Sequence, residues 1–311
     1  MSEQSVTDLS VAGQNVSLFE LIWQLPNDLV LDFLERASAW EMRNNLAGRL
    51  ARTVELVRQP IALTPSLRDR SDEIAKRCAE FVLSSNGSLA ALVVQLERGG
   101  PPALDVEWIG IDNLRSARDG DRPLVVFAPH VGFLYAVPLA LAALGERSAV
   151  LGSEAARDVL MPVLSALAPR LAERIGYIVV PGPGCARAAA GTLARGDVLV
   201  MFPEVNRGAT GNVQSATTTF LGRTIWLPTT AARFARIAHA DILPALVTPG
   251  GARQVRIEFG APIPAPAGRH ADVETSARLF GWLERVIEDR PHLWLGWPML
   301  DSDMNVAADR A

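Results

Sequence analysis

Short apolar runs alternate with longer amphipathic segments from about residue 104 to residue 288, and this alternation constrains the fold more than any other feature. The runs are rich in Val, Ile and Leu and indicate buried strands, whereas the longer segments repeat their apolar residues at helical spacing. Strands are expected at residues 104–111, 124–128, 148–151, 177–181, 197–202, 242–248 and 253–259, and helices at 113–118, 136–144, 158–175, 186–194, 227–239 and 273–288. This order predicts an α/β fold, a mostly parallel sheet flanked by helices on both faces.

The first 100 residues follow a different pattern and predict an N-terminal helical region, with the α/β body in residues 101–311. The stop Gly99-Gly100-Pro101-Pro102 marks the expected boundary. Residues 1–16 are polar, and we expect no regular structure there. Residues 41–98 predict several helices separated by breaks.

Residues 18–40 predict two short and very apolar helices on either side of Pro26. Two interpretations of this stretch stay open. It packs in the core, or it contacts an acyl chain or the surface of a membrane.

Charge and cysteine usage narrow the functional class. The net charge of −4 leaves no basic excess to neutralise phosphates, which argues against a nucleic-acid binder. Cys78 and Cys185 lie far apart and predict neither a disulfide framework nor a metal site, so a reducing cytoplasm is expected. We find no secretory leader and no run of about 18 apolar residues, so no membrane-spanning helix is expected.

One strand of the predicted sheet leads directly to a histidine. The stretch Leu124-Val-Val-Phe-Ala-Pro-His130 is a buried strand that ends just before His130, and an apolar helix follows. Open α/β sheets place their chemistry at the carboxyl ends of their strands, which makes His130 a candidate catalytic residue. The alternative is a loop histidine with a structural role only.

A second buried strand runs into Phe202-Pro203-Glu204-Val-Asn206-Arg207-Gly208. If the two strands are neighbours in a parallel sheet, His130 and Glu204 emerge at the same edge. A histidine and a carboxylate at the same edge of the sheet are the minimum for general-base chemistry. The forked guanidinium of Arg207 suits a phosphate or a carboxylate. The alternative is a surface ion pair between Glu204 and Arg207, which contributes little.

Several stretches, taken in order, resemble the lipid A late acyltransferases of the wider lysophospholipid acyltransferase superfamily. The matching stretches are residues 106–114, 127–132, 196–204, 219–222, 228–235, 240–244 and 291–294. The resemblance runs from about 104 to 298. The Phe202-Pro203-Glu204-x-x-Arg207 block is more similar to that of the glycerolipid acyltransferases.

This resemblance implies transfer of a fatty acyl group from a thioester to a hydroxyl or an amine, with a histidine as the general base. In the family an acid follows the histidine by five positions, but the fifth position after His130 is Tyr135. The resemblance makes His130 the candidate base, and Glu204, expected at the same edge of the sheet, is the candidate carboxylate that supports it. The candidate substrate-binding residues are Arg207, Asn206, Gly208, Tyr135 and Phe133.

Three explanations compete for the missing acid. Glu204 supports His130 in its place, or the acceptor is activated enough for a lone histidine, or the chain binds an acyl chain or carrier protein without turnover. The resemblance implies acyl-carrier protein or acyl-CoA as donor and a lipid, sugar or specialised metabolite as acceptor. Because the thioester supplies the driving force, no metal or other cofactor is expected. The expected location is the cytoplasm, with residues 18–40 as the candidate peripheral membrane contact.

Overall fold

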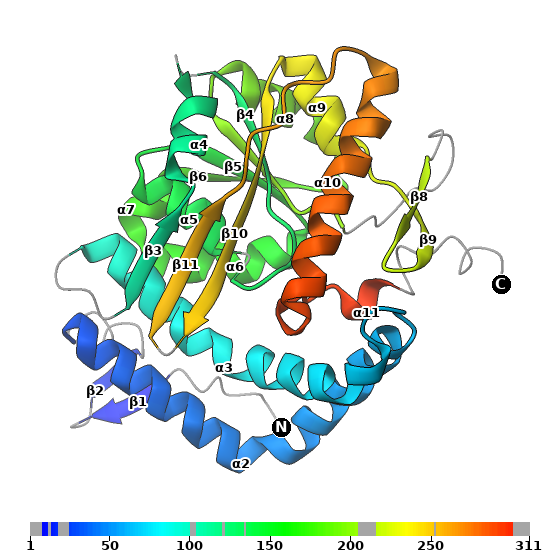
Figure 1. The fold of residues 1–311 in the computed structure, drawn as a ribbon. Helices are drawn as coiled ribbons and strands as arrows, with labels where there is room; N and C mark the ends of the chain where they lie inside the picture. Colours follow the sequence, from blue (N-terminus) through cyan, green and yellow to red (C-terminus); the bar gives the residue numbers. More distant parts are fainter. Residues whose placement is uncertain are drawn as a thin grey trace.

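The computed structural model describes residues 8–11, 14–17, 25–99, 104–119, 122–133, 135–204, 216–251 and 253–300. Its centre is a seven-stranded sheet with the strand order β3-β11-β10-β4-β7-β5-β6 (Figure 1). These strands are β3 (Asp105–Ile109), β4 (Leu124–Phe127), β5 (Ser148–Gly152), β6 (Ile175–Val179), β7 (Val198–Met201), β10 (Asp241–Gly251) and β11 (Gln254–Phe259). Within the sheet β10 and β11 pair antiparallel and the other neighbours pair parallel, which confirms the predicted fold class.

The order of the strands decides which helices cover which face. From β4 through β5 to β6 the chain steps in one direction, and from β6 through β7 to β10 it steps back. Because crossovers between parallel strands are right-handed, the first set of helices lies on one face and the second on the other. The first set is α5 (Ala136–Ala143), α6 (Glu154–Leu167) and α7 (Pro169–Ala172); the second is α8 (Cys185–Ala194) and α9 (Thr230–Ala238). The long helix α10 (Arg269–Asp289) packs against α9, and α4 (Ile111–Ala117) packs against β10 and β11.

The N-terminal region contains two long helices, α2 (Asn27–Ala62) and α3 (Ser71–Arg98), joined through the short helix η1 (Arg68–Arg70). Figure 1 shows α3 between α2 and the α/β body, and α3 packs on α5, α6 and α7. Buried residues of α3 such as Ile74 and Leu92 belong to the same hydrophobic core as the sheet. The division of the chain near residue 100 stays a prediction.

Two expectations for this region were wrong. Residues 41–98 lie in two long helices rather than several short ones, because α2 continues to Ala62, with Pro60 in its last turn, and α3 spans Ser71–Arg98. The polar N-terminal segment is not without regular structure, because β1 (Asp8–Val11) and β2 (Gln14–Ser17) pair as an antiparallel hairpin. Of the stretch 18–40, residues 18–24 lie outside the described part of the chain.

A second hairpin, which the sequence pattern did not predict, is formed by β8 (Thr217–Phe220) and β9 (Arg223–Trp226). Its turn has φ +50° at Leu221 and +77° at Gly222, the two positive values that a tight hairpin turn of the primed type requires. The buried Arg223 anchors the hairpin on the end of α2, since its guanidinium donates to the Pro60 carbonyl at 2.8 Å.

No single helix in the described part of the chain is long and apolar enough to cross a membrane. Two adjacent segments, Arg68–Ser85 and Gly87–Arg98, reach that length and composition only when they are taken together, and they meet at an angle of 44°.

Candidate functional site

The candidate site lies where β4 and β7 end side by side. Their parallel register pairs Leu124 with Val198 and Phe127 with Met201. The Ala128 N–H extends this ladder by donating to the Met201 carbonyl at 2.9 Å. His130 follows Phe127 by three residues and Glu204 follows Met201 by three, so the equal offsets carry both side chains to the same point at the carboxyl edge of the sheet.

His130 and Glu204 meet there through two hydrogen bonds. Glu204 Oε2 lies 3.1 Å from His130 Nδ1, and Glu204 Oε1 accepts the backbone N–H of His130 at 2.6 Å. The Glu204 side chain is fully buried, whereas 18% of the His130 side chain is exposed. Because a carboxylate oxygen accepts hydrogen bonds, this contact favours the tautomer with the proton on Nδ1, which leaves a lone pair on Nε2.

The loop after His130 is held on both sides by backbone contacts. The Gly132 N–H donates to the Leu293 carbonyl at 2.8 Å, and the Phe133 N–H donates to the Val247 carbonyl at 2.7 Å. Gly132 has φ +68°, and a Cβ at this position would lie 2.4 Å from the Val247 oxygen. Only glycine fits such a close approach with a positive φ, so the loop geometry depends on Gly132.

Two of the predicted substrate-binding residues lie on different sides of this loop. Phe133 is 4% exposed and packs on the Phe81 ring of α3, with 5.8 Å between the ring centroids. Tyr135 is half-buried at the start of α5, and its ring meets the Phe202 ring edge-on at 6.1 Å. Phe202 also contacts the His130 ring at 5.4 Å. Tyr135 thus lies near the histidine, whereas Phe133 is buried against the helical N-terminal region; a binding role for either stays a prediction.

Burial shapes the chemistry of Tyr135. Desolvation raises the pKa of its phenol above the ordinary 10.0, so the side chain is neutral at physiological pH. A neutral phenol cannot supply the negative charge that an acid at this position would. The other predicted substrate-binding residues, Asn206, Arg207 and Gly208, lie outside the described part of the chain.

The sequence interpretation missed Trp294 as a part of this site. Its indole Nε1–H donates to Glu204 Oε1 at 3.4 Å, across 90 positions of sequence. The Leu295 N–H donates to the His130 carbonyl at 2.7 Å, and Val131 pairs with Trp294 in an isolated antiparallel bridge. Residues 291–294 belong to the stretches that carry the family resemblance, but nothing in the sequence pattern links Trp294 to a carboxylate.

The other histidines lie apart from this pair. His239 ends α9 in a left-handed conformation, and His270 is exposed in the first turn of α10. His292 lies in the short helix η3 (Pro291–Leu293), where Arg77 Nη2 is 3.2 Å from its Nε2. Among the described residues, no group of three His, Cys, Asp or Glu side chains is placed to hold a metal ion.

Burial, together with the positive charges of Arg77 and Arg290, lowers the pKa of His292 from the ordinary 6.5 to about 4. Between these two values the unfolded chain binds a proton that the folded protein does not. The stability contributed by neutral His292 is therefore fully present above about pH 6.5 and is lost as the pH falls toward 4.

We expect His292→Gln to weaken the pH dependence of unfolding, because glutamine stays neutral throughout this range. The difference between the two proteins, discounted for solvent screening, is about 1–2 kcal/mol across the window. Urea unfolding at about pH 7.5 and about pH 4.5 measures it. The exposed His270→Gln is the control, and parallel pH slopes for wild type and His292→Gln would contradict the assignment.

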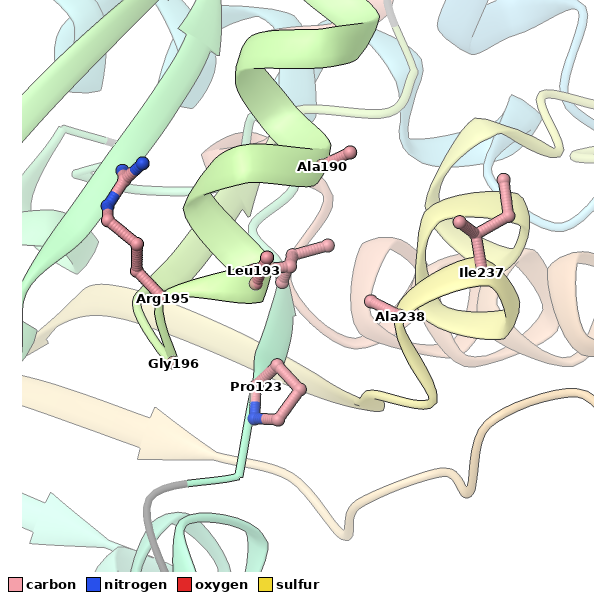
Figure 2. A pocket seen from close by; sticks show the side chains of 8 residues that line it. Pro123, Ala190, Leu193, Arg195, Gly196, Ile237 and Ala238 are labelled. Carbon is pink, nitrogen blue, oxygen red and sulfur yellow. The ribbon is translucent and has the colours of Figure 1, made fainter.

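A pocket of about 650 Å³ lies at the opposite end of the sheet (Figure 2). It is lined by Leu193 and neighbouring residues at the end of α8, by Ile237 and Ala238 at the end of α9, and by Pro123 just before β4. Since β4 starts beside this pocket and ends at Phe127, three residues before His130, the length of the strand separates the pocket from the candidate site. The pocket is not part of the candidate site.

A mostly parallel sheet with a histidine–carboxylate pair at its carboxyl edge defines an α/β protein that carries the groups for general-base chemistry. The family model for bacterial lipid A biosynthesis acyltransferases matches residues 101–297, and the chain belongs to this family. The resemblance found in the sequence is thereby confirmed, and membership supports acyl transfer as the general activity.

Among solved structures, the chain is similar to the 1-acyl-sn-glycerophosphate acyltransferase PlsC from Thermotoga maritima. The sequence identity is 15%, the match covers 84% of this chain and 97% of that chain, and the TM-score is 0.38. A search of curated proteins gives no match.

Proposed function

We propose that the protein transfers a fatty acyl group from an acyl-carrier-protein or CoA thioester to a hydroxyl or amine, with His130 as the general base. The acceptor class is a lipid, a sugar or a specialised metabolite. Membership of the acyltransferase family supports the reaction type. The contact between His130 Nδ1 and the fully buried Glu204 is the observation that carries the proposal.

This contact favours catalysis over binding alone. Moving a carboxylate out of water costs several kcal/mol unless it is paired and hydrogen-bonded. A protein that only holds an acyl chain has no use for a buried charge beside a histidine. A general base does, because the carboxylate stabilises the imidazolium that forms when His130 takes a proton.

The proposed reaction needs only the acceptor and the thioester. His130 Nε2 takes the proton from the acceptor hydroxyl or amine while the acceptor oxygen or nitrogen attacks the thioester carbonyl carbon. The tetrahedral intermediate collapses as the carbon–sulfur bond breaks, and the imidazolium returns the proton to the departing thiolate. Glu204 stays ionised throughout and holds Nδ1–H. The thioester supplies the driving force, so no cofactor takes part.

In this proposal Glu204 takes the place of the acid that Tyr135 does not provide. The Tyr135 ring instead packs on Phe202, which also covers the His130 ring. The rings of Tyr135 and Phe202 thus form an aromatic wall on this side of the imidazole. We therefore interpret Tyr135 as a changed residue of a working site rather than the mark of a lost one.

Tyr135→Glu tests that interpretation. We expect it to lower kcat/KM roughly tenfold or more, because a second carboxylate next to Phe202 is desolvated and disrupts the aromatic wall. Tyr135→Phe, which keeps the ring, should retain activity close to wild type and serves as the control. Higher activity in Tyr135→Glu would mean instead that the position is a decayed acid site.

The finer parts of the proposal concern partners and location. Arg207 is proposed to bind a phosphate of the donor arm or of the acceptor, with Asn206 and Gly208 shaping its loop.

The reaction is proposed to take place on the cytoplasmic side, where residues 18–40 contact the membrane surface. Leu29, which is 47% exposed on α2, supports such a contact. Vesicle flotation of wild type against Leu29→Glu tests it.

Acyl transfer itself is tested by incubating the protein with acyl-CoA or acyl-carrier protein, with lipid, sugar or amine acceptors, and measuring released thiol and product mass. Turnover by wild type is the expected result. Bound fatty acid without thiol release, in every donor and acceptor combination, would favour the alternative of a binding protein that lacks turnover.

A further inference from the structure

Trp294 contacts the buried carboxylate of the candidate site, although it belongs to the C-terminal segment between η3 and α11 (Trp297–Met299). Its Nε1–H reaches Glu204 Oε1 at 3.4 Å, and the same oxygen accepts the His130 backbone N–H at 2.6 Å. Oε2 faces His130 Nδ1. The two donors on Oε1 therefore fix which oxygen of Glu204 points at the imidazole ring.

The Trp294 ring is itself held in place. It is 1% exposed and packs between Phe220 of β8 at 5.9 Å and Trp297 at 4.8 Å, both nearly edge-on. The backbone on either side of Trp294 bonds to the loop that carries the histidine, since Leu295 N donates to His130 O and Gly132 N to Leu293 O. One segment thus braces both members of the pair.

The chemistry of indole suits this position. An indole N–H only donates, so it favours the ionised form of the carboxylate and does not compete for its charge. A hydrogen bond to a charged and buried group contributes more than one between neutral groups. At 3.4 Å the bond is long, which places its expected effect at the lower end of that range.

We propose that Trp294 is a positioning residue for the reaction, one that keeps the Glu204 carboxylate turned toward His130 Nδ1. This inference rests on the proposed function of the pair. Within the described residues, the side-chain hydrogen bonds of His130 and Glu204 run to each other and to Trp294, so the pH–rate profile reports on this arrangement.

Removing the indole donor changes how the His130–Glu204 pair holds its charge. Loss of the indole N–H destabilises the carboxylate most when His130 is neutral, because the imidazolium otherwise compensates the negative charge. The pair then holds its proton to a higher pH. The acid limb of the profile for kcat/KM is therefore expected to move to higher pH when the indole donor is removed.

The test compares Trp294→Phe with Trp297→Phe. Both tryptophans are buried in the same aromatic cluster, and each substitution removes one indole hydrogen bond. The bond lost from Trp297 runs to the Pro291 carbonyl at 2.8 Å and not to Glu204. Trp294→Phe should lower kcat about tenfold with little change in KM and shift the acid limb upward. Trp297→Phe should lower stability without moving the limb. An unshifted limb in Trp294→Phe, or an equal shift in both variants, overturns the inference.

A second measurement covers the case in which Trp294→Phe does not fold. Replacing Trp294 by 3-benzothienylalanine keeps the size and shape of the ring and exchanges the N–H for sulfur. The same fall in kcat and shift of the limb are expected, and wild-type behaviour would refute the role of the N–H. Failure of the proposed function looks different, because the wild-type protein itself would then release no thiol from any thioester.

Discussion

Replacing His130 with alanine is expected to reduce acyl transfer by roughly 10³-fold or more, which is within the range for loss of a general base. The variant removes the only group at the strand ends that the geometry leaves with a basic lone pair, Nε2, among the residues described there. The acceptor must then lose its proton to water. The measurement is kcat/KM from thiol release, with whichever thioester the wild-type protein accepts.

The fold of this variant should survive, because the loop at His130 is held through its backbone. The His130 carbonyl accepts from Leu295 N and its N–H donates to Glu204, and both groups remain in alanine. Part of the His130 side chain is exposed, so added imidazole can reach the space and should restore some activity. His270→Ala, at an exposed position in α10, is the matched control. A folded His130→Ala protein with near-full turnover would rule out the base mechanism.

The two halves of the candidate site were predictable because each lies at the end of a very apolar strand. The stretches before His130 and Glu204 indicate buried parallel strands from composition alone. Their adjacency could not be predicted in this way. β7 pairs with β4 and separates it from β5, although β5 and β6 lie between them in the sequence. Such nonlocal pairing depends on how whole faces pack and leaves no mark in either strand.

The contribution of Trp294 was harder still to predict. The local sequence pattern shows only an apolar C-terminal segment, and it does not distinguish Trp294 from Trp297. What separates them is that one indole reaches a carboxylate and the other a backbone carbonyl. A rule of charge satisfaction offers the only hint, because a buried Glu204 must find donors somewhere in the fold. The β8–β9 hairpin, which supplies Phe220 to this cluster, escaped prediction because its strands, Thr-Thr-Thr-Phe and Arg-Thr-Ile-Trp, are not apolar runs like β4 and β7.

Glu204→Gln is expected to lower kcat/KM roughly 10³-fold, less than the ~10⁴ typical of the comparable change in serine proteases, because a thioester is a more reactive acyl donor than an amide. The amide oxygen can accept only one of the two bonds from His130. If it accepts the backbone N–H, the amide nitrogen faces Nδ1 and selects the tautomer with the proton on Nε2. That tautomer cannot act as the base.

The control for lost charge alone is Glu97→Gln. Glu97 is also buried, at 2% exposure, and accepts three hydrogen bonds at 3.0 Å from the backbone and side chain of Arg170 and the backbone of Leu171. It joins α3 to α7, away from His130. Both variants should unfold at lower urea concentration, but only Glu204→Gln should lose activity. Wild-type kcat/KM in a folded Glu204→Gln protein would show that His130 works without a carboxylate, because no other described group contacts its Nδ1 in place of Glu204.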